Sequence, residues 1–128
     1  TYGDVCCGID CGFSPYPRCV LAPVQVPGIT NAAKVYAGAN IACAIETDGT
    51  LWCWGKGDKG QLGNGATATS PAPVQVSGLT GVAGAALGEE HSCAYTKDGV
   101  AWCWGKNDRG QLGNGDVNSS VPLKVQGL

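Results

Sequence analysis

Few side chains in this sequence have the type and spacing that catalysis requires. His91 is the only histidine among 128 residues. Asp58 and Asp108 each stand alone in a Gly-rich stretch, and we expect each to cap a turn by accepting hydrogen bonds from nearby backbone N–H groups. Asp48 and Asp98 each precede a glycine in a predicted hairpin loop, where turn chemistry alone accounts for an aspartate. Since no nucleophile is paired with a base and no phosphate-binding loop occurs, we predict no catalytic or cofactor-binding residues and expect that the protein is not an enzyme.

Eight cysteines are the other reactive side chains. Their even number favours disulfides, and therefore a secreted, extracellular or cell-surface location. Zinc is the alternative. With one histidine and no CxxC pair, the N-terminal cysteine cluster is the only candidate zinc site, and we favour disulfides there as well. The adjacent pair is expected to bond to different partners, in an order that the sequence leaves open. The cluster consists of Cys6, Cys7, Cys11 and Cys19.

Composition excludes several classes of partner and favours one class of fold. A net charge of −2 and a pI of about 5.1 lack the positive footprint that nucleic acid or an anionic membrane requires. No apolar run reaches the roughly 18 residues of a membrane-spanning helix. Because the chain starts at Thr1 and contains no Met, we expect a mature chain or part of a longer one. Its 21 glycines and 7 prolines indicate many turns and short strands.

The chain contains an internal repeat of 50 residues. Residues 31–65 align without a gap with residues 81–115, at 18 identities in 35 positions. The element PVQV occurs before both copies and returns as PLKV near the end. Periods of roughly 40 to 50 residues with short strands and Gly-rich turns are typical of propeller blades. We expect an all-β fold of tandem four-stranded antiparallel blades, forming a partial β-propeller or a propeller-like assembly. Its parts are a Cys-rich segment, 1–30, ending in the last strand of a preceding blade, then blade 1, 31–78, and blade 2, 79–128.

One hairpin in each repeat can be given a register from the sequence. If residues 47–49 form a three-residue loop with Gly49 in the left-handed conformation, Cys43 lies opposite Cys53. A two-residue loop would shift the register by one and separate the two cysteines. The register predicts two disulfides, Cys43–Cys53 and Cys93–Cys103.

The four tryptophans follow from the same register. Each lies opposite an alanine or a serine, so that a large ring faces a small residue. We expect the rings to pack between blades, and the alternative is a sugar-binding or ligand-stacking surface. These residues are Trp52, Trp54, Trp102 and Trp104.

A Gly-rich loop follows the second strand of each hairpin. Positions 57 and 107 hold Gly and Asn, which share a tolerance for positive φ, so we expect a left-handed turn there. The glutamine amide of each GQLG motif is expected to tie the loop to neighbouring backbone. Asn118 begins a glycosylation sequon. The repeated motif residues are Trp52, Trp54, Gly55, Gln61, Gly63, Trp102, Trp104, Gly105, Gln111 and Gly113.

The motif DGxxWCWGKxDxGQLGNG, preceded by GxxxxCA and followed by PxxVxG, resembles the repeat of the regulator of chromosome condensation family over residues 21–128. The resemblance implies seven-bladed propellers that act as binding platforms, in nucleotide exchange on a small GTPase, chromatin docking, ubiquitin-ligase accessory domains and secreted inhibitors. About two and a half repeats are present, whereas seven at this period would need about 350 residues. The paired cysteines and acidic pI depart from the nuclear members.

These observations predict a non-enzymatic extracellular structural or protein-binding module. Two blades leave a blade face uncovered at each end, so we expect docking of further copies end to end. The predicted partner is therefore protein, in the first place the chain itself, with no nucleic acid and no membrane insertion. The alternatives are a secreted protein inhibitor, a receptor-like binding platform, or a fragment of a seven-bladed propeller.

Overall fold

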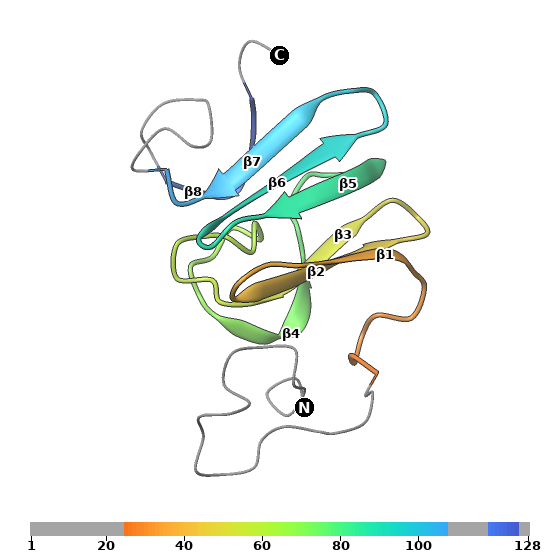
Figure 1. Cartoon of the computed structure of the whole chain (residues 1–128), viewed down its shortest axis with the longest axis horizontal. Helices are drawn as coiled ribbons and strands as arrows, with labels where there is room; N and C mark the ends of the chain where they lie inside the picture. Colours follow the sequence, from red (N-terminus) through yellow and green to blue (C-terminus); the bar gives the residue numbers. More distant parts are fainter. Residues whose placement is uncertain (1–24, 108–117, 126–128) are drawn as a thin grey trace.

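Two four-stranded antiparallel sheets, stacked face to face, form the part of the chain that the structure describes (Figure 1). The structure is a computed structural model, and it describes residues 25–107 and 118–125. Blade 1 has the strand order β1-β2-β3-β4 and blade 2 the order β5-β6-β7-β8. The strands are β1 (Ala32–Ala37), β2 (Ile41–Glu46), β3 (Leu51–Gly55), β4 (Ser70–Gln75), β5 (Val82–Leu87), β6 (His91–Thr96), β7 (Ala101–Gly105) and β8 (Ser119–Lys124).

The all-β prediction with four strands per repeat is confirmed. The strand predicted before blade 1, at residues 23–26, lies partly outside the described residues. Its described end, Gln25 and Val26, is not in a strand. Within the described ranges, the structure contains no helix with the length and apolar character needed to cross a bilayer.

The register predicted for the central hairpins is confirmed in both blades. Cys43 pairs with Cys53 across β2 and β3, and Cys93 pairs with Cys103 across β6 and β7. The three-residue loop is closed by a hydrogen bond of 2.9 Å from the Glu46 N–H to the Thr50 carbonyl. Gly49 has a φ of 86°, which favours glycine strongly over residues with a side chain.

Disulfides join both cysteine pairs of these hairpins. The S–S distance is 2.11 Å for Cys43–Cys53 and 2.07 Å for Cys93–Cys103. Each bond links the two central strands of its blade. The four cysteines of the N-terminal cluster lie outside the described residues, so their pairing stays a prediction.

The prediction of a left-handed turn at positions 57 and 107 is wrong. Neither Gly57 nor Asn107 has a positive φ. Space explains the glycine, because a Cβ at position 57 would lie 2.3 Å from the Ala68 carbonyl oxygen. Both positions close the base of their loop through the backbone N–H: Gly57 donates to Thr69 Oγ1 at 3.2 Å and Asn107 to Asn118 Oδ1 at 2.6 Å. The exchange between Gly and Asn therefore does not reflect the handedness of the backbone.

The larger hydrophobic cluster lies between the blades. Blade 1 contributes the disulfide Cys43–Cys53 with Ile45 and Leu51, and blade 2 contributes Trp104 and other residues. The opposite face of blade 1 carries a smaller cluster in which Ile29 packs with Ala44 and Trp54. Neither sheet could bury both of its faces alone, which is typical of repeat architectures. The two blades are therefore one structural unit.

Candidate protein interface

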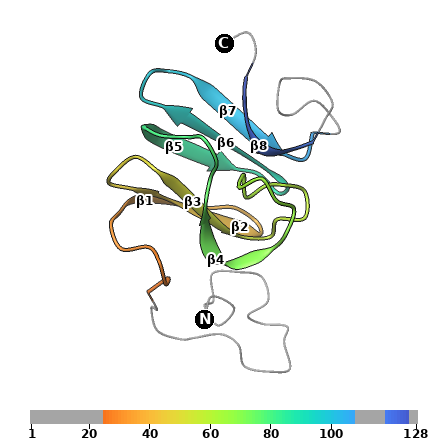
Figure 2. The same cartoon turned by 180° about the vertical axis from the view of Figure 1, so that it is seen from behind.

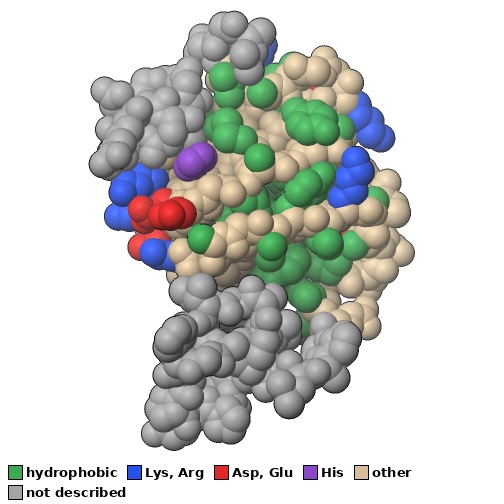
Figure 3. Space-filling view, viewed as in Figure 1, with side chains coloured by type: hydrophobic (Ala, Val, Ile, Leu, Met, Phe, Trp, Pro, Cys, Tyr) green, Lys and Arg blue, Asp and Glu red, His purple; other side chains and the backbone are tan. Residues whose placement is uncertain are grey.

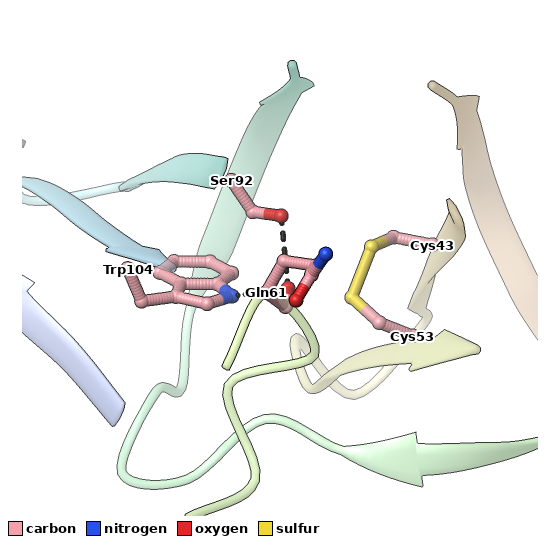
Figure 4. Close-up of a disulfide and its surroundings, with 5 residues drawn as sticks. All are labelled: Cys43, Cys53, Gln61, Ser92 and Trp104. Atoms are coloured by element: carbon pink, nitrogen blue, oxygen red, sulfur yellow. Dashed lines mark hydrogen bonds between the residues drawn. A yellow bond between two sulfur atoms is a disulfide. The ribbon is translucent and has the colours of Figure 1, made fainter. Parts of the chain in front are cut away.

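A main-chain carbonyl of blade 1 forms the centre of the junction between the blades. The Gly-rich loop between β3 and β4 reaches from blade 1 to blade 2 (Figure 2). At its tip the Gln61 carbonyl accepts hydrogen bonds from Ser92 Oγ at 2.9 Å and Trp104 Nε1 at 2.8 Å (Figure 4). Gln61, Ser92 and Trp104 are all 0% exposed. Buried donors that lack an acceptor are costly, so this carbonyl makes burial of both groups favourable.

Gly63 lets the loop lie directly against the Trp104 ring. Its φ is 72°, and a Cβ at this position would lie 2.7 Å from Trp104 Nε1. The residue is therefore constrained twice, by its backbone conformation and by the approach of the ring. A further bond of 2.9 Å runs from the Gly65 N–H to the Ser120 carbonyl of β8.

The side chain of Gln61 stabilises the loop from inside. Its Oε1 accepts a bond of 2.7 Å from the Lys59 N–H, so the predicted tie between amide and backbone is confirmed. Its Nε2 donates to Asp58 Oδ1 at 3.3 Å. Asp58 was predicted to accept from backbone N–H groups, and among the described residues it accepts from this amide. Asp108, Gln111 and Gly113 of the second loop lie outside the described residues.

Blade 2 covers the inner face of blade 1 almost completely. Cys43, Cys53 and Leu51 are each 0% exposed and Ile45 is 4% exposed. Lys34 at the edge of this face donates from Nζ to the Ala83 carbonyl of β5 at 3.0 Å. Four central residues of one blade are thus sealed by the strand pair of the next. When another blade packs on a blade face of this protein, the central residues of that face are therefore almost fully buried.

The outer face of blade 2 is the equivalent repeat surface, and it is more exposed than the inner face of blade 1. We call it the open face and define it by Cys93, Tyr95, Ala101 and Cys103, which alternate along β6 and β7 with the residues that face blade 1. Tyr95 is 53% exposed, against 4% for its counterpart Ile45. Its ring lies over Gly84, where a Cβ would be 2.3 Å from Tyr95 Cε1. The open face is therefore apolar, with Tyr95 accessible to solvent.

The outer face of blade 1 is covered at its centre. Ala44 is 0% and Trp54 is 7% exposed, with Ile29 and Val26 packed against them. The face is open at its edges, at Val35 of β1, which is 70% exposed, and at the exposed Gln75 of β4. The expectation of an uncovered blade face at each end is thus met at blade 2 and is wrong for the centre of blade 1, because the segment before β1 fills that position.

The prediction that the tryptophans pack between blades fits Trp104 and Trp102, whereas Trp54 and Trp52 pack with Ile29 on the outer face of blade 1. The rings also differ in their hydrogen bonds. Trp104 lies between the blades, and Trp102 packs against the same cluster. Trp52 Nε1 donates to Thr50 Oγ1 at 2.9 Å. In blade 2 the residue at the equivalent position is Val100, and the buried Trp102 Nε1 has no partner among the described residues. This difference between the two hairpins could be found by comparing positions 50 and 100.

The two hairpin aspartates organise their turns as predicted. Asp48 Oδ1 accepts from the Thr50 N–H at 3.0 Å and from Thr50 Oγ1 at 2.6 Å. The bond from the Thr50 hydroxyl is the main reason that the pKa of Asp48 is lowered from its usual value. Asp98 accepts from the Thr96 hydroxyl, which lowers its pKa in the same way.

No group of catalytic or metal-binding side chains is brought together in the described ranges. His91 lies in β6 opposite Gly105, with its ring over Gly88. A hollow beside Trp102 is lined by Asp98, Lys97 and the hydroxyl residues Thr80 and Thr96, but by no histidine or cysteine. Within residues 25–107 and 118–125, no three His, Cys, Asp or Glu side chains form a cluster that could hold a metal.

Charged side chains lie mainly toward the margins of the molecule in the view of Figure 3, with apolar side chains in the middle. An ion pair of 3.1 Å joins Lys106 Nζ to Glu90. Asn118 is exposed overall, although its Oδ1 accepts the bond that closes the second loop. The fold and these contacts define a β-propeller repeat protein whose blades bind one another through apolar faces and a main-chain acceptor.

Comparison with known proteins identifies the repeat. The model of the regulator of chromosome condensation (RCC1) repeat matches residues 48–95 and 98–128, and a second model of this repeat matches residues 32–61 and 82–111. The chain therefore belongs to the RCC1 repeat family. The human E3 ubiquitin-protein ligase HERC2 is 38% identical to this chain over 64 residues, a stretch that covers 50% of this chain and 1% of HERC2.

Solved structures agree with the fold. Human WBSCR16 superposes with a TM-score of 0.70 at 27% identity, covering 81% of this chain and 28% of that chain. Yeast RCC1 (Prp20), crystallised with Kap60, gives a TM-score of 0.69 at 27% identity over 83% of this chain and 26% of its own. Prp20p from Saccharomyces cerevisiae, studied for its binding to Gsp1p and histones, gives 0.69 at 21% identity, covering 81% of this chain and 27% of its own. The chain thus spans about a quarter of the length of these proteins.

Proposed function

We propose that this chain is a non-enzymatic, disulfide-stabilised protein-binding module that works outside the cytosol. Its partner, in the first place a second copy of the chain, docks on the open face of blade 2. One observation carries the proposal: Tyr95 is 53% exposed, whereas the equivalent Ile45 is 4% exposed because blade 2 covers it. The equivalent face of blade 1 is already a protein-binding surface, because blade 2 packs on it, and an exposed apolar face of the same kind on blade 2 is therefore a candidate docking surface.

Protein binding is supported by the relatives. Prp20p binds Gsp1p and histones, and yeast RCC1 binds Kap60. An extracellular or other oxidising location is supported by the disulfides Cys43–Cys53 and Cys93–Cys103, since such bonds persist mainly outside the cytosol.

A contact between two copies is expected to be symmetric. End-to-end stacking would need the outer face of blade 1, and its centre is filled, with Trp54 at 7% exposure. Two open faces can instead meet about a two-fold axis, which is the commonest symmetry of soluble homo-oligomers. Tyr95 of each copy would then lie within the interface.

A further blade of a longer chain is the second candidate occupant. It is favoured by coverage, because the chain accounts for 26–28% of the solved structures that it resembles. In this case the open face would be sealed as the inner face of blade 1 is.

Light scattering over a range of protein concentrations tests the proposal. We expect a dimer that dissociates on dilution, and a monomer at every concentration for Tyr95→Lys, because the substitution places a charge at the centre of the contact. The matched control is Lys97→Glu, which changes charge at an exposed residue of the β6–β7 hairpin outside the open face. A wild-type chain that stays monomeric throughout would contradict self-association and favour the second occupant.

A further inference from the structure

The two disulfides occupy equivalent positions but very different surroundings. Cys43 and Cys53 are both 0% exposed, because Trp104 and Ala94 of blade 2 pack in the same cluster. Cys103 is 6% exposed and Cys93 is half-buried. Neither the pairing nor the sequence separation of 10 distinguishes the two bonds. Blade 2 itself makes the difference, since it covers one bond and leaves the other on its open face.

Access controls the reactivity of a disulfide. Thiol–disulfide exchange needs a thiolate to reach one of the two sulfur atoms, so a bond sealed on all sides reacts only when the protein opens. For Cys43–Cys53 this opening means separating the blades, which breaks both bonds to the Gln61 carbonyl. Cys93 is already partly exposed to solvent in the closed junction, so attack on Cys93–Cys103 does not require the blades to separate.

We infer that Cys93–Cys103 is a thiol-sensitive bond in the centre of the open face, and that a protein docked there protects it, as blade 2 protects Cys43–Cys53. The first half stands on exposure alone, while the second rests on the proposed function. In the reaction a thiolate of a small thiol attacks Cys93 Sγ, forms a mixed disulfide and releases Cys103 as a thiolate. A second thiol displaces Cys93, so that the pair gains two electrons and two protons and the small thiol leaves as its disulfide.

Reduction and docking then oppose one another. The bond closes a loop of 10 residues between β6 and β7, and its loss lets the hairpin that carries Tyr95 fluctuate. A partner that binds the oxidised face better than the reduced one stabilises the bond by the same free energy. A reducing environment would therefore weaken docking, and an occupied face would resist reduction.

Timed reduction of the folded chain tests the first half. The chain is treated with dithiothreitol, quenched with iodoacetamide, and the labelled peptides are quantified. We expect Cys93 and Cys103 to be labelled at least about tenfold faster than Cys43 and Cys53. Equal rates, or faster labelling of the blade 1 pair, would overturn the inference.

A variant assigns the fast phase. In Cys93→Ala with Cys103→Ala, the fast phase should disappear while the labelling rate of Cys43 and Cys53 stays unchanged. Should this variant unfold, its Cys43 would be labelled at once, and the peptide rates of the wild-type chain then decide.

The concentration dependence of the same measurement tests the second half. If copies dock on the open face, the fast phase slows at concentrations where light scattering finds a dimer, and the slow phase does not change. A dimer whose fast phase is as fast as that of the monomer would overturn protection at this face. A chain that is always monomeric contradicts the proposed self-association, yet leaves the difference between the two bonds measurable.

Discussion

A difference between the two central hairpins predicts a stabilising substitution in blade 2. In blade 1 the Thr50 hydroxyl accepts from Trp52 Nε1, whereas Val100 leaves the buried Trp102 Nε1 without a partner among the described residues. Val100→Thr should supply the missing acceptor. A hydrogen bond contributes about 0.5–1.5 kcal/mol net, and a buried donor without a partner costs about 1–3 kcal/mol. Partial burial of the new hydroxyl at the half-buried position 100 costs part of this gain. The free energy of unfolding should therefore rise by about 1 kcal/mol.

Urea unfolding with the disulfides intact, followed by tryptophan fluorescence, measures the change. The reverse substitution, Thr50→Val, removes the bonds to Trp52 and to Asp48 and should lower the free energy of unfolding by about 1–2 kcal/mol. A double-mutant cycle is the control: with Trp102→Phe in the background, Val100→Thr should lose its benefit, because no indole N–H remains. An equal gain in both backgrounds would refute the reasoning.

Three further outcomes follow from the junction and the turns. Gly63→Ala should destabilise the chain by about 2–3 kcal/mol more than Gly78→Ala in urea unfolding, since both have positive φ (72° and 73°) but only Gly63 meets the Trp104 ring. Trp104→Phe should lower the free energy of unfolding by about 1–2 kcal/mol by removing the donor to the Gln61 carbonyl. Because its hydrogen bonds lower the pKa of Asp48, folding stability should fall as the pH drops below the usual value of 3.8, and Asp48→Asn should flatten this dependence in acid titrations.

Strand pairing could be predicted from the sequence because local constraints coincide. A three-residue loop ending in Gly49 sets the register, and the register then places cysteine opposite cysteine and each tryptophan opposite a small residue. Any one of these patterns alone would leave another register open. The repeat supplies each of them twice, and resemblance to a known family adds the arrangement of strands into blades.

The junction was harder to predict because its central acceptor belongs to the main chain. The sequence drew attention to the Gln61 amide, but the amide acts within its own loop and the carbonyl binds the next blade. Ser92 was recognised only as a small residue opposite Trp104, and its hydroxyl turned out to bond to that carbonyl. The prediction of a left-handed turn at Gly57 was wrong because two different constraints, a positive φ and a shortage of space, both select glycine.

The main-chain acceptor at Gln61 has a consequence for how such proteins can change over generations. Every residue type presents the same carbonyl, so the contact survives substitution of the side chain as long as the loop keeps its path. When a gene segment is duplicated in tandem, the new repeat therefore keeps this contact between blades, and the neighbouring repeat needs no compensating change. Divergence can then proceed at positions such as 45 and 95, where one unit has isoleucine and the other tyrosine, while the joint stays the same.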